Sequence, residues 1–543
     1  MATVTFELKE FYDKGIEKQR LITAVPEFGM EIESIDESSV TIDITPNRPD
    51  LLDFTGMVRQ LRYFTKKTQP REKGYRIKEE SGISVTIDPS VHDVRPFAAC
   101  MVVNNADLSG NALKNLINFT EKLASTYGRK RRKMAIGIHN LDMVEGSNLL
   151  YAASRSKRIV PLGEKRDMSF DQVMASTDKG AEYSSIIPAS GDPKFAFLED
   201  KKKVLAMIPI INSEDTRVTE STKNLLAFVD GTSKKAVEDT LKILACSFID
   251  SGATVSSCRM IYGGKEETTP DLTLREIRIR NSKIRKTIGS RLDQSEMISC
   301  ANKMGYFGAK YGDYILAYVP PYRVDVLNEQ DLIEDIAMGF GYLNIEPLPV
   351  MSAGGGTPDA SSEYHNRLAK TMVGLGFTEA MNQYLTNERT NFENVSREYK
   401  KDEVISLMNS KTEAITMMRT DIIPSLLTNL MVSAKERMPQ KIFEVGKVFK
   451  VENGKVVEQD RLAFVSAHSK ANFSEAKSTI EAILMHRKGW TIEKHTDALF
   501  IEGRCAKAVA NGAEIAVFGE IHPRVLSNFK IEEPVIAGEF VSL

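Results

Sequence analysis

The segment PPYRVDVLNEQDLIEDIAMGFGYLNI, residues 320–345, holds the densest group of carboxylates in this chain of 543 residues. A strand-like stretch ends near Asp325, and an apolar periodicity typical of a helix follows it. Asp331, Glu334 and Asp335 lie at the start of that helix, where spacings of three and four residues place side chains on one face. The segment predicts a strand-to-helix unit that presents several carboxylates together.

Such a carboxylate group has two interpretations. Mg²⁺ requires an octahedral shell of oxygen ligands and few protein ligands, so these side chains suit it. Acidic residues also gather in the first turn of a helix because they complement the positive end of its dipole. The spacing by itself favours the dipole explanation and leaves the metal open.

The surrounding residues 266–350 form a small predicted unit. Strand-like LREIRIR, helical SKIRKTIG and SEMISCANKMG, and strand-like YILAYVPP precede the acidic helix. This order of helix, turn, helix and two-stranded wing predicts a winged-helix-like module. The stretch SAGGGTPDASS, residues 352–362, follows it and predicts a linker, because consecutive glycines have no packing side chains.

The whole chain is predicted to be an α+β multidomain protein, since its length exceeds what one core supports. Antiparallel strands alternate with helices after the linker, which is typical of an α+β domain. The predicted divisions are an N-terminal module (1–85), a mixed α/β domain (86–265), the winged-helix-like module (266–350) and a last domain (351–543).

A proline-bracketed turn closes the first strands of the N-terminal module. Pro46 and Pro49 restrict the backbone on both sides of Arg48, so we expect an extended turn that presents this side chain outward. Asp50 is in a position to cap the following helix.

Composition limits the possible functions. Lys and Arg total 72 against 74 Asp and Glu, which excludes the basic coat of a non-specific nucleic-acid binder and leaves room for local contacts. The five cysteines form no zinc-binding pattern, and no run of about 18 apolar residues predicts a membrane span. The first residues lack the apolar core of a signal peptide, so we expect a cytoplasmic protein.

The most basic run directly precedes a strand-like segment. It could contact an RNA backbone, although such runs are usually solvated loops without base recognition. The candidate nucleic-acid contacts are Arg129, Lys130, Arg131, Arg132 and Lys133.

Several small polar residues follow strand-like segments of the second domain. His139 closes one such strand and is a candidate general base or a structural residue. Asn212, Ser213, Asp230 and Thr232 could orient an ester and a water for hydrolysis, but the same residue types also make ordinary turns.

Six blocks in one order connect these features. Together they resemble the beta subunit of phenylalanyl-tRNA synthetase of the archaeal and eukaryotic type, over almost the whole chain. The blocks are TPNRPDLL (45–52), RKRRKMAIGIHNLD (129–142), IPIINSEDTRVTESTKN (208–224), the opening segment (320–345), MRTDIIPSLL (418–427) and KIFEVGKVF (441–449).

The resemblance implies an α2β2 tetramer in which the alpha subunit uses ATP to charge tRNA(Phe). It also implies a class II synthetase-like last domain without catalysis. Phe443 precedes Glu444 where a catalytic version carries FRxE, and no arginine-bearing third motif follows. Arg419 and Glu444 therefore predict a salt bridge rather than an ATP site. In the family, the positions of Asp325, Asp331, Glu334 and Asp335 bind Mg²⁺, which favours the metal here.

The resemblance further implies that residues 86–265 hydrolyse tRNA mischarged with tyrosine. The candidate residues are those named above in this domain. One departure concerns Phe228, which stands where the family pattern near FVDGTS places an acid, so Asp230 and Thr232 are the nearest substitutes. Two other functions remain alternatives: a stand-alone nucleic-acid-binding regulator and a Mg²⁺-dependent hydrolase.

Overall fold

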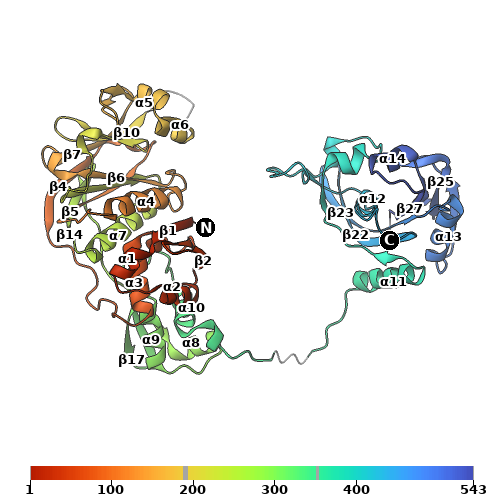
Figure 1. Cartoon of the computed structure of the whole chain (residues 1–543), viewed down its shortest axis with the longest axis horizontal. Helices are drawn as coiled ribbons and strands as arrows, with labels where there is room; N and C mark the ends of the chain where they lie inside the picture. Colours follow the sequence, from red (N-terminus) through yellow and green to blue (C-terminus); the bar gives the residue numbers. More distant parts are fainter. Residues whose placement is uncertain (1, 188–193, 350–353, 542–543) are drawn as a thin grey trace. The chain divides into compact units, whose positions relative to one another are not determined.

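The computed structural model describes residues 2–187, 194–349 and 354–541. Contacts between Cα atoms divide the chain into two compact units, Met1–Pro349 and Val350–Leu543, drawn in Figure 1. The predicted linker begins outside the described residues, and its described part from residue 354 to 359 is exposed without regular secondary structure.

The N-terminal part of the first unit packs three helices on a three-stranded sheet. The sheet has the order β1-β3-β2, and alternating burial along β3 points its apolar side chains into the core. The elements are β1 (Ala2–Glu7), β2 (Glu31–Ile35), β3 (Ser39–Ile44), α1 (Leu8–Asp13), α2 (Lys18–Glu27) and α3 (Phe54–Phe64).

The predicted outward turn before α3 is wrong in both of its details. Arg48 is 2% exposed and forms an ion pair of 2.9 Å with Asp50. Asp53, not Asp50, caps α3 by accepting the backbone N–H of Gly56. A buried carboxylate next to the turn overrides the tendency of arginine to face water, because the pair satisfies both charges.

A ten-stranded mixed sheet forms the centre of the first unit. Its strands lie in the order β12-β11-β10-β7-β4-β14-β5-β13-β6, and β15 pairs with β14 beyond the predicted domain boundary at residue 265. The strands are β4 (Glu80–Ile87), β5 (Phe97–Asn104), β6 (Met134–Asn140), β7 (Asn148–Ser154), β10 (Phe195–Glu199), β11 (Val204–Ile208), β12 (Ile211–Asn212), β13 (Leu225–Gly231), β14 (Thr254–Tyr262) and β15 (Lys265–Thr269).

The two faces of this sheet have different covers. Helices α4 (Ala112–Ser125) and α7 (Lys234–Asp250) pack on the same face, as Figure 1 shows. The opposite face encloses its own apolar cluster, in which Ile208 of β11 joins Phe228 of β13. The sheet is therefore curled, and its end strands β12 and β6 contact each other.

A small subdomain extends the β10 and β11 side of the sheet and has a separate apolar cluster. Its elements are β8 (Arg158–Ile159), β9 (Met168–Ser169), α5 (Phe170–Ser176) and α6 (Asp178–Tyr183).

The last part of the first unit has the predicted order of elements. Sheet β16-β18-β17 is antiparallel and packs with two helices, and a third helix follows it. The elements are β16 (Arg275–Arg280), α8 (Asn281–Ile288), α9 (Gln294–Lys303), β17 (Phe307–Tyr311), β18 (Tyr314–Val319) and α10 (Glu329–Phe340).

Buried charges join the parts of the first unit. Arg59 of α3 pairs with Asp50 at 3.1 Å and with Asp250 at the end of α7 at 2.8 Å. Its guanidinium lies 3.6 Å from the ring centre of Tyr322, after β18. One apolar cluster likewise contains residues from all three parts.

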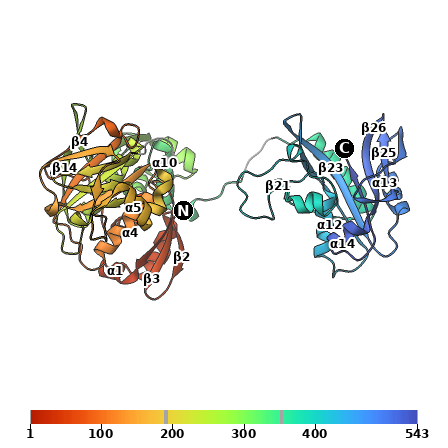
Figure 2. The same ribbon diagram turned by 90° about the horizontal axis from the view of Figure 1, so that it is seen from above.

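The second unit is a seven-stranded sheet covered by helices on both faces. The order is β19-β22-β23-β27-β26-β25-β24, antiparallel except for β19 with β22. Helices α12 and α14, both labelled in Figure 2, pack on one face, and α11 and α13 pack on the other. The elements are α11 (Ala360–Gly374), α12 (Ile423–Val432), α13 (Phe473–Ile483), α14 (Pro523–Asn528), β19 (Thr378–Glu379), β22 (Gln440–Glu452), β23 (Lys455–Ala467), β24 (Trp490–Lys494), β25 (Phe500–Ala510), β26 (Ala513–Ile521) and β27 (Val535–Phe540).

Beyond β19, which ends at Glu379, the chain forms a separate two-stranded pair, β20 (Leu385–Thr386) with β21 (Met417–Met418). Among the described residues, no helix is long and apolar enough to cross a membrane.

Candidate functional site

A cavity of about 500 Å³ lies where the two ends of the curled sheet meet. Strands β6 and β13 supply one side, and β11 and β12 with the loop after them supply the other. Most of its lining is apolar, which suits an aromatic or aliphatic group. The apolar side chains include Leu116, Ile136, Ile138, Ile208, Ile210 and Phe228.

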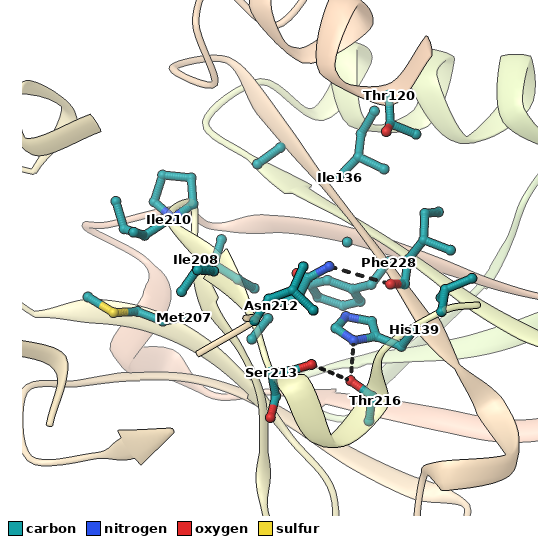
Figure 3. A pocket seen from close by; sticks show the side chains of 18 of the residues that line it. Thr120, Ile136, His139, Met207, Ile208, Ile210, Asn212, Ser213, Thr216 and Phe228 are labelled. Carbon is teal, nitrogen blue, oxygen red and sulfur yellow. Dashed lines mark hydrogen bonds between the residues drawn. The ribbon is translucent and has the colours of Figure 1, made fainter. Parts of the chain in front are cut away.

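His139 is fully buried in the wall of this cavity. Its Nδ1 lies 2.9 Å from the hydroxyl oxygen of Thr216. A dashed line in Figure 3 marks this contact. Its Nε2 has no hydrogen-bond partner among the described residues. Burial lowers the pKa of His139 to about 4, because a charged imidazolium loses its water there. The ring is therefore neutral at physiological pH.

Asn212 and Ser213 also line the cavity, together with His139. The amide nitrogen of Asn212 donates to the carbonyl oxygen of Ile138 at 3.4 Å. The hydroxyl of Ser213 donates to the carbonyl oxygen of Val160 at 3.2 Å and accepts the backbone N–H of Asp215. The Asn212 amide thus links β12 to β6, whereas the Ser213 hydroxyl links the loop after β12 to the segment after β8.

Asp230 reaches the cavity wall, but its carboxylate is occupied by a structural pair. It is 2% exposed, forms an ion pair with Arg95 and accepts the Tyr151 hydroxyl at 3.3 Å. Burial raises the pKa of Asp230, and the charge of Arg95 opposes that shift. Thr232 is exposed, lies outside the cavity lining and donates to the carbonyl oxygen of Arg132 at 3.0 Å.

Phe228 lies on the same face of the sheet as His139. It is 1% exposed and stands directly opposite Gly137 in the pairing of β13 with β6. Its ring contacts Tyr151, with 5.3 Å between ring centres. An aromatic wall therefore stands where an acid was expected.

The basic run forms a tight loop in which one residue points inward. The guanidinium of Arg131 donates to the carbonyl oxygens of Pro209 and Ile210, each at 2.9 Å, and pairs with Glu121 at 2.8 Å. Arg131 thus links this loop to the segment after β11 and lines the cavity. Arg129, Lys130 and Arg132 are exposed, and Lys133 is half-buried.

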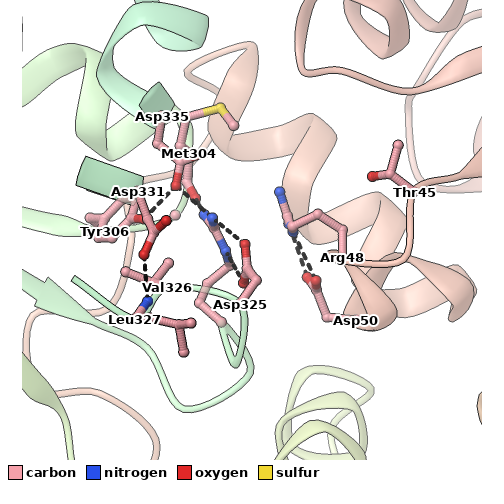
Figure 4. A network of polar contacts seen from close by, with 12 residues as sticks. Thr45, Arg48, Asp50, Met304, Tyr306, Asp325, Val326, Leu327, Asp331 and Asp335 are labelled. Carbon is pink, nitrogen blue, oxygen red and sulfur yellow. Dashed lines mark hydrogen bonds and ion pairs between the residues drawn. The ribbon is translucent and has the colours of Figure 1, made fainter. Parts of the chain in front are cut away.

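The four predicted magnesium ligands do not converge in the structure. Arg323 pairs with two of them, Asp325 and Asp335, which are labelled in Figure 4. Its guanidinium binds Asp325 at 2.8 and 2.9 Å and Asp335 at 2.5 Å, while Tyr306 also donates to Asp335. Burial raises the pKa of Asp335, and Arg323 is the largest opposing influence.

The other two carboxylates have separate environments. Asp331 accepts the backbone N–H groups of Leu327 and Asn328 at 2.6 and 2.9 Å, so it stabilises the start of α10. Glu334 is exposed. In the described parts of the chain, no three His, Cys, Asp or Glu side chains are grouped to hold a metal ion. As arranged, this donor set binds an arginine and does not fit Mg²⁺.

The second unit contains the predicted ion pair of Arg419 and Glu444, at 2.7 Å. Both side chains are buried, at 0% and 2% exposure, so the pair belongs to the core rather than to a sheet edge. Arg419 also donates to the carbonyl oxygen of Lys447, and Asn382 donates to Glu444.

Sequence reasoning missed the partners that define these sites. Thr216 and Gly137 lie in the same sequence blocks as the predicted residues but carry no reactive group that marks them. Arg95 lies 135 residues from Asp230. Arg323 was recognisable, because an arginine two residues before an aspartate can pair with it locally.

Comparison with known proteins identifies the family. The chain is 34% identical over 532 residues to the phenylalanine–tRNA ligase beta subunit of Archaeoglobus fulgidus, covering 97% of this chain and 95% of the relative. The chain belongs to the family of phenylalanine–tRNA ligase beta subunits. Another member, from Methanosphaera stadtmanae, is 32% identical, with 99% of each chain covered.

Two family models match separate parts of the chain after residue 276. Residues 277–342 match the tRNA synthetase B5 domain, and residues 346–541 match the CLM domain of the phenylalanyl-tRNA synthetase beta chain. An N-terminal fragment of the beta subunit from Pyrococcus horikoshii matches with a TM-score of 0.59 and 28% identity, covering 62% of this chain and 99% of the fragment.

Proposed function

We propose that the chain works as the beta subunit of a phenylalanine–tRNA ligase, with a separate alpha subunit that uses ATP to attach phenylalanine to tRNA(Phe). The observation that carries this is identity to ligase beta subunits over nearly the full length of both chains. That extent argues against a stand-alone nucleic-acid regulator and against a Mg²⁺-dependent hydrolase. An α2β2 assembly in the cytoplasm belongs to the same proposal.

We infer that the second unit is class II synthetase-like but does not form the adenylate. Its antiparallel sheet with helices on both faces supports the first part. The closed pair of Arg419 and Glu444 supports the second, because this arginine is not free to neutralise ATP phosphates. The order β16, α8, α9, β17, β18 similarly supports a winged-helix-like module in the first unit.

Co-expression with a candidate alpha subunit tests the ligase proposal. We expect phenylalanylation of tRNA(Phe) only when both chains are present, and a stable complex of the two on gel filtration. Phenylalanylation by this chain alone, or full activity of the alpha chain alone, would overturn the division of labour.

We propose that the cavity at the sheet ends hydrolyses tyrosyl-tRNA(Phe). Support comes from an apolar chamber of about 500 Å³ that also contains His139, Asn212 and Ser213 at one side. Asp230 and Thr232 support the surrounding structure in this proposal. Deacylation of tyrosyl-tRNA(Phe) by the assembled complex is the test, and a rate no higher than spontaneous ester hydrolysis would remove the proposal.

The resemblance predicts a magnesium ion at Asp325, Asp331, Glu334 and Asp335, and the closed arrangement of these residues argues against it. Arg323 fills the space between two of these carboxylates, so a cation requires a rearrangement of this pair. We expect added Mg²⁺ to leave the melting temperature of the isolated chain unchanged. A shift that Glu334→Gln abolishes would contradict this and support the metal.

A further inference from the structure

A second cavity, of about 300 Å³, lies in the second unit on the face of the sheet that α12 covers. Strands β22, β23, β25, β26 and β27 line it, together with the start of α12 and the segment from residue 392 to 404. Cavities of this size hold small molecules in many proteins. The ligase and hydrolysis proposals leave this cavity without a role.

Part of the lining is apolar. Phe392 and Phe500 contribute aromatic rings, and Ile423 and Val517 contribute aliphatic side chains. None of the four residues is more than 9% exposed. This surface favours a ligand that has an aliphatic or aromatic group to bury.

The charged part of the lining is a network around Asp421. Arg397 pairs with Asp421 at 3.3 Å and with Asp497 at 2.9 Å. Arg461 pairs with Asp421 at 3.1 Å and with Glu539 at 3.0 Å. Burial acts to raise the pKa of Asp421, but the two guanidinium groups lower it to about 2, so this carboxylate is ionised at physiological pH. The network therefore contains three carboxylates for two guanidinium groups.

Lys450 of β22 lines the same cavity but lies outside the network. Its side chain is half-buried, and among the described residues it forms no ion pair. Its charge still contributes to the lowered pKa of Asp421, so the two groups lie near each other without pairing. An ammonium group that is partly removed from water is stabilised by an anionic partner, and the described residues do not supply one.

These two features together define the charges of a ligand. A carboxylate would supply the partner of Lys450, and an adjacent ammonium group would lie beside Asp421, in a network with an excess of carboxylates. A phosphate group suits this site less, because its charge of about −1.5 to −2 would face three carboxylates. A metal ion also suits it less, since no three His, Cys, Asp or Glu side chains in the described parts of the chain are grouped to hold one.

We propose that this cavity binds a free α-amino acid with an apolar side chain, whose carboxylate pairs with Lys450 and whose ammonium group pairs with Asp421. The side chain of the ligand packs against Phe392 and Phe500. An α-amino acid carries its two charges next to each other, which matches two opposite charges of the protein that are close together but unpaired. The second unit is then a small-molecule binding unit, a role that goes beyond the proposed ligase function.

Isothermal titration calorimetry on the full-length chain tests this pattern of charges. The probes are L-leucine, L-leucinamide, which lacks the carboxylate, and N-acetyl-L-leucine, which lacks the ammonium group. We expect L-leucine to bind at least about tenfold more tightly than either derivative, because each derivative loses one charged partner. No binding of L-leucine, or equal binding of all three probes, would overturn the inference.

Substitution of Lys450 tests the assignment of the carboxylate. We expect Lys450→Gln to weaken the binding of L-leucine at least about tenfold, and Lys450→Arg, which keeps the charge, to retain most of the affinity. Lys477→Gln is the matched control, because Lys477 pairs with Glu481 on α13, which packs on the other face of the sheet. This control should leave the affinity unchanged. Equal affinities of the Lys450→Gln and wild-type chains would contradict the inference.

Hydrogen exchange with and without L-leucine locates the site independently of any variant. We expect slower exchange of amides in β22, β27 and residues 392–404, since a bound ligand stabilises the folded state of its site. Protection confined to the first unit would place the amino acid in the other cavity and overturn the inference. Co-expression with the alpha chain tests the ligase proposal separately, so failure of one proposal is distinguishable from failure of the other.

Discussion

The buried charge of Arg419 shows how strongly such a group depends on its partner. Its guanidinium is 0% exposed and pairs with Glu444 at 2.7 Å. Two ions removed from water are stable only as a pair, so loss of one partner leaves an uncompensated charge.

We therefore expect Glu444→Gln to lower the free energy of unfolding of the second unit by about 3 to 5 kcal/mol. Lys477→Ala is the control, because Lys477 pairs with Glu481 at the surface, with both side chains nearly half exposed. Its effect should stay below about 1 kcal/mol. Urea unfolding measures both variants, and similar losses would contradict a special role for burial.

His139 predicts a dependence of stability on pH. The pKa of His139 falls from about 6.5 in the unfolded chain to about 4 in the folded one, because burial excludes water. Between these values the unfolded chain binds more protons, so stability rises with pH. The contribution is fully present above about pH 6.5 and is lost as the pH falls towards 4.

We expect the first unit to lose up to about 3 kcal/mol of stability through this residue on acidification from pH 7 to 4. His139→Gln, which does not titrate, should show a correspondingly flatter profile. Thermal unfolding of both proteins across this range measures the difference. Parallel profiles would mean that His139 titrates alike in the folded and unfolded chains.

The loop from Arg129 to Lys133 combines two roles in one short element. Three successive residues, Arg129, Lys130 and Arg131, have positive φ angles of 50°, 53° and 63°. This conformation is unfavourable for residues with a Cβ, and the hydrogen bonds of Arg131 offset its cost. The turn directs Arg131 inward and leaves the neighbouring cations in water.

We expect the exposed and inward cations of this loop to respond differently to substitution. Arg129→Ala and Lys130→Ala should each reduce the slope of log K against log salt for tRNA binding by about 0.7 to 0.9, if each contacts one phosphate. Arg131→Ala should mainly lower the melting temperature. Filter binding at several salt concentrations measures the slopes, and unchanged slopes would place the tRNA elsewhere.

At the scale of the whole molecule, the chain has two compact units joined near residue 350. Within the first unit, Arg59 and a common apolar cluster connect the N-terminal part, α7 and the region after β15. We therefore expect the first unit to unfold as one body rather than as three modules.

Limited proteolysis tests this organisation. We expect a first cut between residues 350 and 360, because the described residues there are exposed and lack regular secondary structure. The products should be two stable fragments that span about 1–349 and 350–543. Calorimetry on the first fragment should give one transition. An early cut near residue 85 or 265 would contradict the shared core.

The sequence predicted those features that depend on local pattern. Apolar periodicity located α10, and the order of elements from β16 to α10 followed from the same signal. Six short blocks were sufficient to indicate the family, because their order along the chain can be read from the sequence without knowing how the side chains pack. Cavity residues His139, Asn212 and Ser213 were also recognisable as polar residues after strands.

The tertiary structure alone decided what those residues contact. Curling of the sheet brings β6 to β12, and this closes the cavity and buries His139 beside Thr216. Arg95 forms an ion pair with Asp230, and Arg323 forms ion pairs with two of the predicted metal ligands. A sequence specifies which charges exist, but their partners depend on long-range packing, and in a dry interior the nearest opposite charge determines what each group can do.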